Sequence, residues 1–125
     1  MARSGFFFAS VIGVLLMVSV NTASAAQPSW CHQQSSFTPA ERAICAHASL
    51  WELDALLNDT FQGALYMLGR SGQPQPQQQQ ALRTSEANWL HNVRNPCGNN
   101  VGCLTNAYNS RIQVLEAIRD GRRGV

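Results

Sequence analysis

Four cysteines are the residues of this chain with the clearest chemistry, and they fall into two close pairs. Cys31 and Cys45 lie in the first half of the chain, and Cys97 and Cys103 lie near its end. Four cysteines allow three pairings, and closing a loop costs less entropy when its ends are near neighbours. We therefore predict the disulfides Cys31–Cys45 and Cys97–Cys103 in preference to the two crossed arrangements.

Two other uses of these sulfurs fit the spacing less well. A zinc site made from Cys31, His32, Cys45 and His47 would match none of the compact Cys-x-x-Cys forms. A redox-active second pair would also lack the Cys-x-x-Cys motif, and a structural clamp explains that pair with fewer assumptions. We therefore expect no metal and no cofactor.

Catalytic chemistry finds little support among the other polar residues. The three histidines stand outside any recognisable nucleophile motif, and G-x-S-x-G, H-E-x-x-H, Walker and dinucleotide-binding sequences are absent. A pair of glycosidase carboxylates would have to come from a scattered set of acids, namely Glu41, Glu52, Asp54, Glu86 and Glu116. The sequence does not fix any two of them at the separation that glycoside hydrolysis requires. We therefore expect a protein that is not an enzyme.

Arg111 is a candidate recognition residue because helical spacing places it within an apolar face. A buried guanidinium needs a partner, and Asp54 or Glu86 on neighbouring helices would supply a carboxylate. One interpretation is a structural ion pair that fixes the register of the helices. The other is a recognition site for an anionic or sugar ligand, with Arg94 and Arg111 as donors.

Two further features are candidate binding surfaces. Trp51 projects to a flank of its helix away from the leucines, where it would anchor a protein interface or pack on the segment around the first cysteine. Gly98, Asn99 and Asn100 lie inside the second cysteine ring and are typical of a tight turn that leads into a helix. A turn clamped in this way would be ordered before it binds a partner.

The elements that position these residues are predicted to be helices. Thr38 to Glu41 form a capping box with proline at the first helical position, which starts a short helix toward Cys45. The same spacing from Ser49 to Glu52 starts a longer helix, in which leucines recur at three and four residues until Gly69 or Gly72. Ser71 to Gln80 contain only Gly, Pro, Gln and Ser and are predicted to form a polar connector, with the alternative that its glutamines join the next helix in part.

Two more helices follow this connector. The first carries Leu82, Trp89 and Val93 on one side and should end near Asn95 and Pro96, because proline disfavours helix in the residue before it. The second extends from the Cys103 region to Gly121. No alternating strand pattern competes. The predicted fold is all-α, a small antiparallel bundle of about four helices stapled by two local disulfides.

The first 25 residues have the features of a secretory signal peptide. Arg3 supplies a positive start, an apolar run extends from Phe6 to Val20, and Ala23-Ser24-Ala25 suits a signal peptidase. A retained anchor would need about 18 or more uninterrupted apolar residues. We therefore predict a signal peptide at 1–25, one helical domain at 26–125, no membrane anchor after cleavage, and a periplasmic or secreted location.

Size and charge exclude further classes of function. About 100 mature residues form one domain that buries only a modest core, so covalent staples are expected. Nine arginines, no lysine and seven acids give the chain a net charge of +2, which falls to near +1 when Arg3 is removed. This balance does not indicate binding to nucleic acid or to a membrane surface.

The chain resembles the family named after the N-terminal domain of the lysozyme inhibitor LprI. The resemblance covers nearly all of the mature chain and rests on residues in the family's order: Thr38-Pro39-Ala40-Glu41-Arg42-Ala43-Ile44-Cys45, Leu53-Asp54 with Leu57, Trp89-Leu90, Arg94-Asn95-Pro96-Cys97-Gly98, and Cys103-Leu104 with Tyr108 and Arg111-Ile112. The resemblance implies an exported helical domain with paired cysteines and, for the member that gives the name, inhibition of lysozyme. Two features depart from the pattern: Glu86 stands where the family usually has glutamine, and the stretch from Trp89 to Cys97 is one residue longer.

The leading hypothesis is an exported binding protein with a protein partner, and the resemblance suggests an inhibitor that occludes the sugar cleft of lysozyme. The clamped turn at Gly98 to Gly102 would supply the rigid protrusion. One alternative is an envelope accessory or immunity-type protein that binds a different envelope protein. Another is a small-ligand carrier that uses the bundle interior around Arg111.

Overall fold

The computed structural model describes residues 24–33, 35–70 and 75–125. The predicted signal peptide, 1–25, therefore lies outside the described residues except for Ser24 and Ala25. The described chain contains four α-helices, and no strand occurs in these three ranges. The predicted all-α fold is confirmed, and so are the two local disulfides that staple it.

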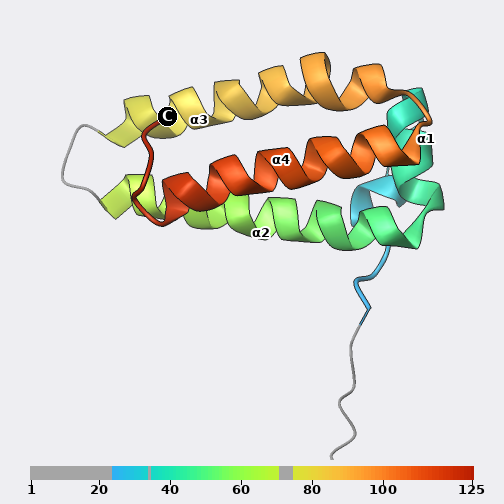
Figure 1. Ribbon diagram of the computed structural model, residues 1–125, viewed down its shortest axis with the longest axis horizontal. Coiled ribbons are helices and arrows are strands. Elements are labelled where there is room, and N and C mark those ends of the chain that lie inside the picture. Colours follow the sequence, from blue (N-terminus) through green and yellow to red (C-terminus); the bar gives the residue numbers. More distant parts are fainter. Residues whose placement is uncertain (1–23, 34, 71–74) are drawn as a thin grey trace, which may run out of the picture.

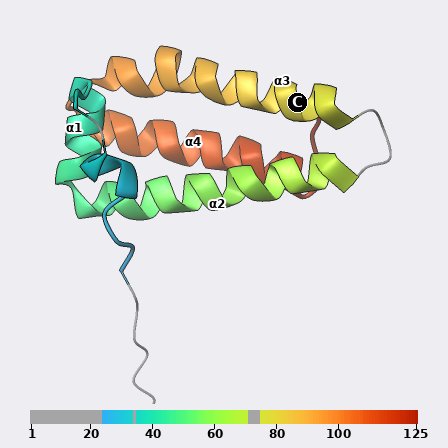
Figure 2. The ribbon, with the colours of Figure 1, turned by 180° about the vertical axis from the view of Figure 1, so that it is seen from behind.

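Three long helices lie side by side and a short helix crosses one end of them (Figure 1). The long helices are α2 (Ala48–Arg70), α3 (Gln75–Trp89) and α4 (Val101–Arg119), and the short one is α1 (Pro39–Ala46). Helix α3 runs antiparallel to α2 and α4, so these two run in the same direction (Figures 1 and 2). Three short elements complete the described chain, namely η1 (Ser29–His32), η2 (Leu90–Arg94) and η3 (Asn95–Cys97).

Helix α1 begins with the capping box that the sequence predicts. The Thr38 hydroxyl accepts a hydrogen bond from the Glu41 amide at 3.2 Å, and the Glu41 carboxylate accepts one from the Thr38 amide at 2.8 Å. Pro39 occupies the first helical position, where an amide hydrogen would have no partner inside the helix. These contacts satisfy two backbone donors at the helix start.

The core lies mainly between α2 and α4. Leucines at three- and four-residue spacing on α2 face the apolar side of α4, and the two helices contribute most of the buried side chains. Helix α3 adds only Leu82 and Trp89 to the buried set, and most of its other residues are polar. The rings of Trp89 and Tyr108 pack edge to face, with their centroids 5.4 Å apart. This contact ties the end of α3 to α4.

Helix α3 begins at Gln75, inside the polar connector predicted from Ser71 to Gln80, so the glutamines of that segment from Gln75 onward join the helix. Pro76 lies in the first turn of the helix, where its missing amide hydrogen removes no internal bond. The side chain of Gln79 donates to the carbonyl of Leu65 on α2 at 2.9 Å. The glutamines therefore form a helical turn that is attached to α2, and the connector is shorter than predicted.

The end of α3 changes from α-helical to π-helical geometry over η2, from Leu90 to Arg94. A π-turn holds one residue more than an α-turn and occurs mostly as a single-turn insertion in a helix. The turn places Arg94 in a buried position, with 8% of the residue exposed.

Both disulfides lie at the end of the bundle that α1 crosses (Figure 1). Cys31–Cys45 ties η1 to the end of α1, and Cys97–Cys103 ties η3 to the first turn of α4. Between η3 and α4 the chain turns at Gly98, whose φ of 56° lies in the left-handed region that favours glycine.

Candidate functional site

A groove of about 480 Å³ runs along α2. One wall is the segment before the first disulfide, which includes Trp30, and the other wall comes from the end of α3 and from η2. Trp51, Asp54 and Phe61 line it from α2, together with Glu86 from α3. Aromatic and charged side chains therefore meet in one concave surface, which is the usual composition of a ligand or partner site.

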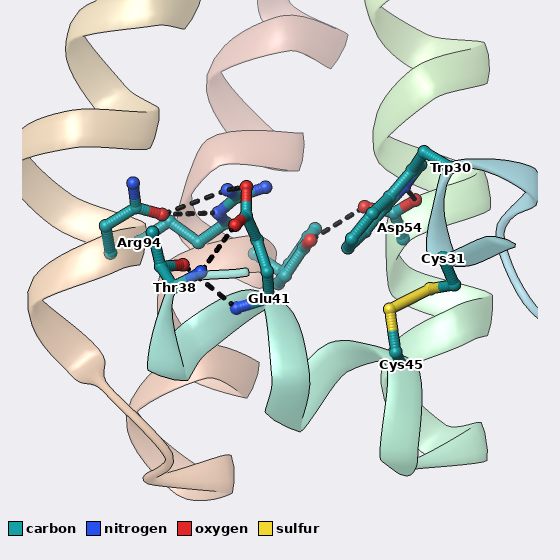
Figure 3. Close-up of polar contacts among 9 residues, drawn as sticks. Trp30, Cys31, Thr38, Glu41, Cys45, Asp54 and Arg94 are labelled. Carbon is teal, nitrogen blue, oxygen red and sulfur yellow. Dashed lines mark hydrogen bonds and ion pairs between the residues drawn. A yellow bond between two sulfur atoms is a disulfide. The ribbon is translucent and has the colours of Figure 1, made fainter. Parts of the chain in front are cut away.

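Asp54 is held by two neutral donors. The Tyr108 hydroxyl donates to one carboxylate oxygen at 2.7 Å, and the Trp30 indole N–H donates to the other at 3.2 Å (Figure 3). Burial raises the pKa of the Tyr108 hydroxyl far above its usual range, and the negative charge of Asp54 raises it further. Tyr108 therefore stays protonated and donates its hydrogen throughout the ordinary pH range.

Arg94 occupies the opposite side of the groove and is fixed from two directions. Its Nε and Nη2 donate to the side-chain oxygen of Asn95 at 3.1 and 2.9 Å, and Nη2 lies 3.4 Å from a carboxylate oxygen of Glu41 (Figure 3). Glu41 thereby joins the capping box of α1 to the π-turn. The guanidinium is positioned by these three contacts before any ligand binds.

Arg111 is buried on α4 and pairs with Glu86. Its Nε donates to a Glu86 carboxylate oxygen at 2.8 Å, and the two side chains are 8% and 13% exposed. The Nη2 atom is buried and has no hydrogen-bond partner among the residues that the structure describes. Of the two carboxylates predicted to approach Arg111, Glu86 makes the contact, and Asp54 instead binds Tyr108 and Trp30.

Trp51 lies on the groove side of α2, partly buried, and its indole N–H donates to the Cys45 carbonyl at 3.3 Å. This contact places it beside the first disulfide. The structure thus brings Trp51 and Arg94 into one groove with Asp54 and Glu86. Arg111 lies behind Glu86 and does not line the groove.

The predicted turn forms a second surface, at the end of the bundle where α1 crosses (Figure 1). Gly98 is partly buried, whereas Asn99 and Asn100 are exposed. The Asn100 side chain caps α4 by accepting from the Cys103 amide at 3.0 Å, so it is committed to the helix start. Asn99 is therefore the side chain of this turn that a partner would meet.

Sequence reasoning did not single out Trp30, Glu41 or Tyr108 as members of a site. Tyr108 carried a usable signal, because its hydroxyl interrupts an apolar stripe and a buried tyrosine usually requires a hydrogen-bond partner. Glu41 was considered as a helix cap and as one of the scattered acids, and its contact to Arg94 depends on how α1 crosses the bundle. Nothing in the local sequence indicates that contact.

Comparison with known proteins decides the family. The model of the family described as "Lysozyme inhibitor LprI" matches residues 31–115, which include both disulfides, the groove residues from Trp51 onward and the clamped turn. The chain belongs to the LprI lysozyme inhibitor family. Comparisons with curated proteins and with solved structures gave no match.

Two further observations bear on the class of protein. Within the described ranges, no helix is both long and apolar enough to cross a membrane. The same ranges hold no group of three or more His, Cys, Asp or Glu residues placed to bind a metal ion. The three histidines, His32, His47 and His91, are all exposed.

Proposed function

We propose that this chain is an exported inhibitor of lysozyme that acts by occluding the sugar cleft of the enzyme. The observation that carries the proposal is membership of the LprI lysozyme inhibitor family across residues 31–115. The two disulfides support export, because such bonds persist in oxidising compartments such as the periplasm and the extracellular medium. The signal peptide predicted at 1–25 supports the same location.

The clamped turn is the surface that best fits an occluding role. It lies at one end of the elongated bundle (Figure 1), and the Cys97–Cys103 disulfide and the Asn100 cap hold it on both sides. A turn that is ordered before binding loses little conformational entropy when it enters a cleft. The mature charge near +1 offers little long-range electrostatic attraction to a partner, so shape has to supply most of the specificity.

A turbidity assay with purified mature protein and several lysozyme types tests the function. We expect dose-dependent protection of bacterial cell walls from at least one type of lysozyme. Absence of protection against every type, together with recovery of a different envelope protein in a pull-down, would instead support the accessory role.

A bulky substitution tests the contact surface. Asn99→Trp should weaken protection by about tenfold or more, since tenfold corresponds to only about 1.4 kcal/mol of lost binding. Gln78→Trp is the matched control, because Gln78 is also exposed but lies near the start of α3, at the opposite end of the bundle. Equal inhibition by the two variants would show that the turn does not contact the enzyme.

A further inference from the structure

The groove along α2 is a concave surface that inhibition through the clamped turn does not use. The groove lies between the segment around Trp30 and the end of α3, and Gly98, Asn99 and Asn100 are not among its lining residues. Its volume of about 480 Å³ falls in the range of small-ligand pockets. From Asp54 to Gln62 it follows α2 for about 12 Å at the helical rise, which is enough for two linked pyranose rings.

Two of the three charged side chains that line the groove are paired inside the protein. Glu86 is paired with Arg111, and Arg94 is paired with Glu41. Asp54 remains as one carboxylate, and both of its oxygens accept hydrogen bonds from neutral donors. An anionic ligand would be repelled by Asp54 and, to reach Arg94, would have to break its partly buried pair with Glu41, which is costly. The groove therefore disfavours an anionic ligand, and the two donors already bonded to the Asp54 oxygens weaken the attraction of this carboxylate for a cation.

The polar groups that remain suit hydroxyl and amide partners. A carboxylate has about four lone-pair sites, and the contacts of Asp54 and Glu86 use only some of them. Asn58 and Gln62, which are exposed and lie one helical turn apart on α2, add amides that both donate and accept. Closely spaced donors and acceptors of this kind match the hydroxyl groups of a sugar.

The aromatic residues supply the apolar half of such a site. The indole N–H of Trp30 is bonded to Asp54, and that of Trp51 is bonded to the Cys45 carbonyl. Each ring is thus fixed through its polar edge. Trp30 also packs on the core and lies with its ring centroid 6.2 Å from that of Phe37, so the parts of the two tryptophan rings that line the groove are the surfaces that would meet the C–H face of a sugar ring. Phe61 extends this apolar surface along α2.

From these features we propose that the groove binds a neutral oligosaccharide. An extended peptide fits less well, because such peptides are usually held by main-chain hydrogen bonds to a sheet edge, and the described part of the chain has no strand. The groove would allow the protein to attach to a glycan while the turn faces the enzyme. This inference does not depend on the proposed inhibition of lysozyme.

Calorimetric titration of the disulfide-bonded mature protein with tri-N-acetylchitotriose, in the absence of lysozyme, tests the inference. We expect saturable binding to one site with a dissociation constant of roughly 1 mM or below, and a change in tryptophan fluorescence because Trp30 and Trp51 line the groove. Lack of saturation up to roughly 10 mM would overturn the proposal. Binding of a neutral tripeptide but not of the trisaccharide would overturn it as well.

Two variants, in each of which an alanine is replaced by tryptophan, locate the site. Ala55 is exposed and lines the groove, so Ala55→Trp should fill it and weaken sugar binding by about tenfold or more. Ala81→Trp is the matched control, since Ala81 is an exposed alanine of α3 that does not line the groove. Unchanged binding by a folded Ala55→Trp protein would contradict the assignment. Ala55→Trp should still inhibit lysozyme and Asn99→Trp should still bind the sugar, so failure of one proposal is distinguishable from failure of the other.

Discussion

At the residue scale, breaking the ion pair between Arg111 and Glu86 should strongly reduce the free energy of unfolding. Arg111→Met removes the cation and leaves a largely buried carboxylate without its partner. Breaking a buried pair in this way costs about 3–5 kcal/mol. We expect a loss of this size in the free energy of unfolding, measured by urea denaturation at pH 7.

The double variant Glu86→Leu with Arg111→Met is the control for this experiment. Replacing both charges with apolar side chains removes the unpaired carboxylate, so most of the lost stability should return. A single Arg111→Met variant that unfolds at the same urea concentration as the parent, but has lost ligand or partner binding, would favour the recognition role over the structural one.

Tyr108 gives the molecule a specific response to alkaline pH. The usual pKa of tyrosine is about 10, and burial followed by the charge of Asp54 holds the folded-state pKa well above that value. The stabilising contribution is therefore present in full below pH 10. It is lost as the pH rises further, because the unfolded chain releases a proton that the folded chain retains. Urea denaturation should show stability falling by about 1.4 kcal/mol per pH unit above pH 10.

The composition makes this slope easy to assign. The chain has no lysine and all four cysteines are paired, so few other groups titrate near pH 10. Tyr108→Phe should abolish the Tyr108 contribution to the slope, and at pH 7 it should cost about 1–3 kcal/mol because Asp54 loses a donor. An unchanged alkaline slope in the Phe variant would assign the titration to another group.

At the scale of the elements, signals within one or two helical turns were sufficient to predict the helices. The capping box at Thr38 and the leucine spacing of α2 are of this kind, and the near-neighbour pairing of cysteines follows the same local logic. The sequence left open how many of the glutamines join α3, because glutamine and proline are common in connectors, whereas Gln79 is held by a contact to α2.

The candidate site was less predictable than the helices because its contacts join segments that are distant in sequence. Arg94 reaches Glu41 across 53 residues and Tyr108 reaches Asp54 across 54. The sequence indicated that a buried arginine needed a carboxylate, but the choice between Asp54 and Glu86 depends on how the helices are rotated in the bundle. Helical periodicity placed both acids near the core and could not rank them.

The two disulfides should have different effects when each is removed. Cys31–Cys45 spans 14 residues and Cys97–Cys103 spans 6, so the chain-entropy model assigns them about 3 and about 2 kcal/mol. Replacing Cys31 and Cys45 with alanine should therefore lower the melting temperature more than the same change at Cys97 and Cys103. Differential scanning calorimetry of the two double variants measures this order.

If the turn contacts the enzyme, removing Cys97–Cys103 should reduce lysozyme inhibition more than removing Cys31–Cys45 does, which is the opposite of the order expected for melting temperature. Loss of Cys97–Cys103 releases the turn and should reduce lysozyme inhibition, whereas loss of Cys31–Cys45 releases the groove wall that carries Trp30 and should reduce sugar binding. If inhibition instead declines in step with melting temperature in both variants, the effect is one of general stability and the turn has no special role.

At the scale of the whole molecule, stability and location are linked through the disulfides. A domain of about 100 residues buries a modest core, and domains of this size are stable by only about 5–15 kcal/mol. The two disulfides together contribute about 5 kcal/mol in the chain-entropy model. They are therefore a large share of the total, and the reduced chain should be close to unfolding.

This link gives a prediction about export. The complete chain expressed in a bacterium should be recovered from the periplasm or the medium as a form that begins at Ala26 and has no free thiol, as shown by intact-mass analysis. The same domain expressed without residues 1–25 in a reducing cytosol should have a lower melting temperature, which oxidation restores. Replacing Ala23 and Ala25 with leucine should block cleavage, because the signal peptidase needs small residues there. A chain that stays in the cytosol and keeps the same melting temperature when reduced would contradict both the export and the dependence of the fold on its disulfides.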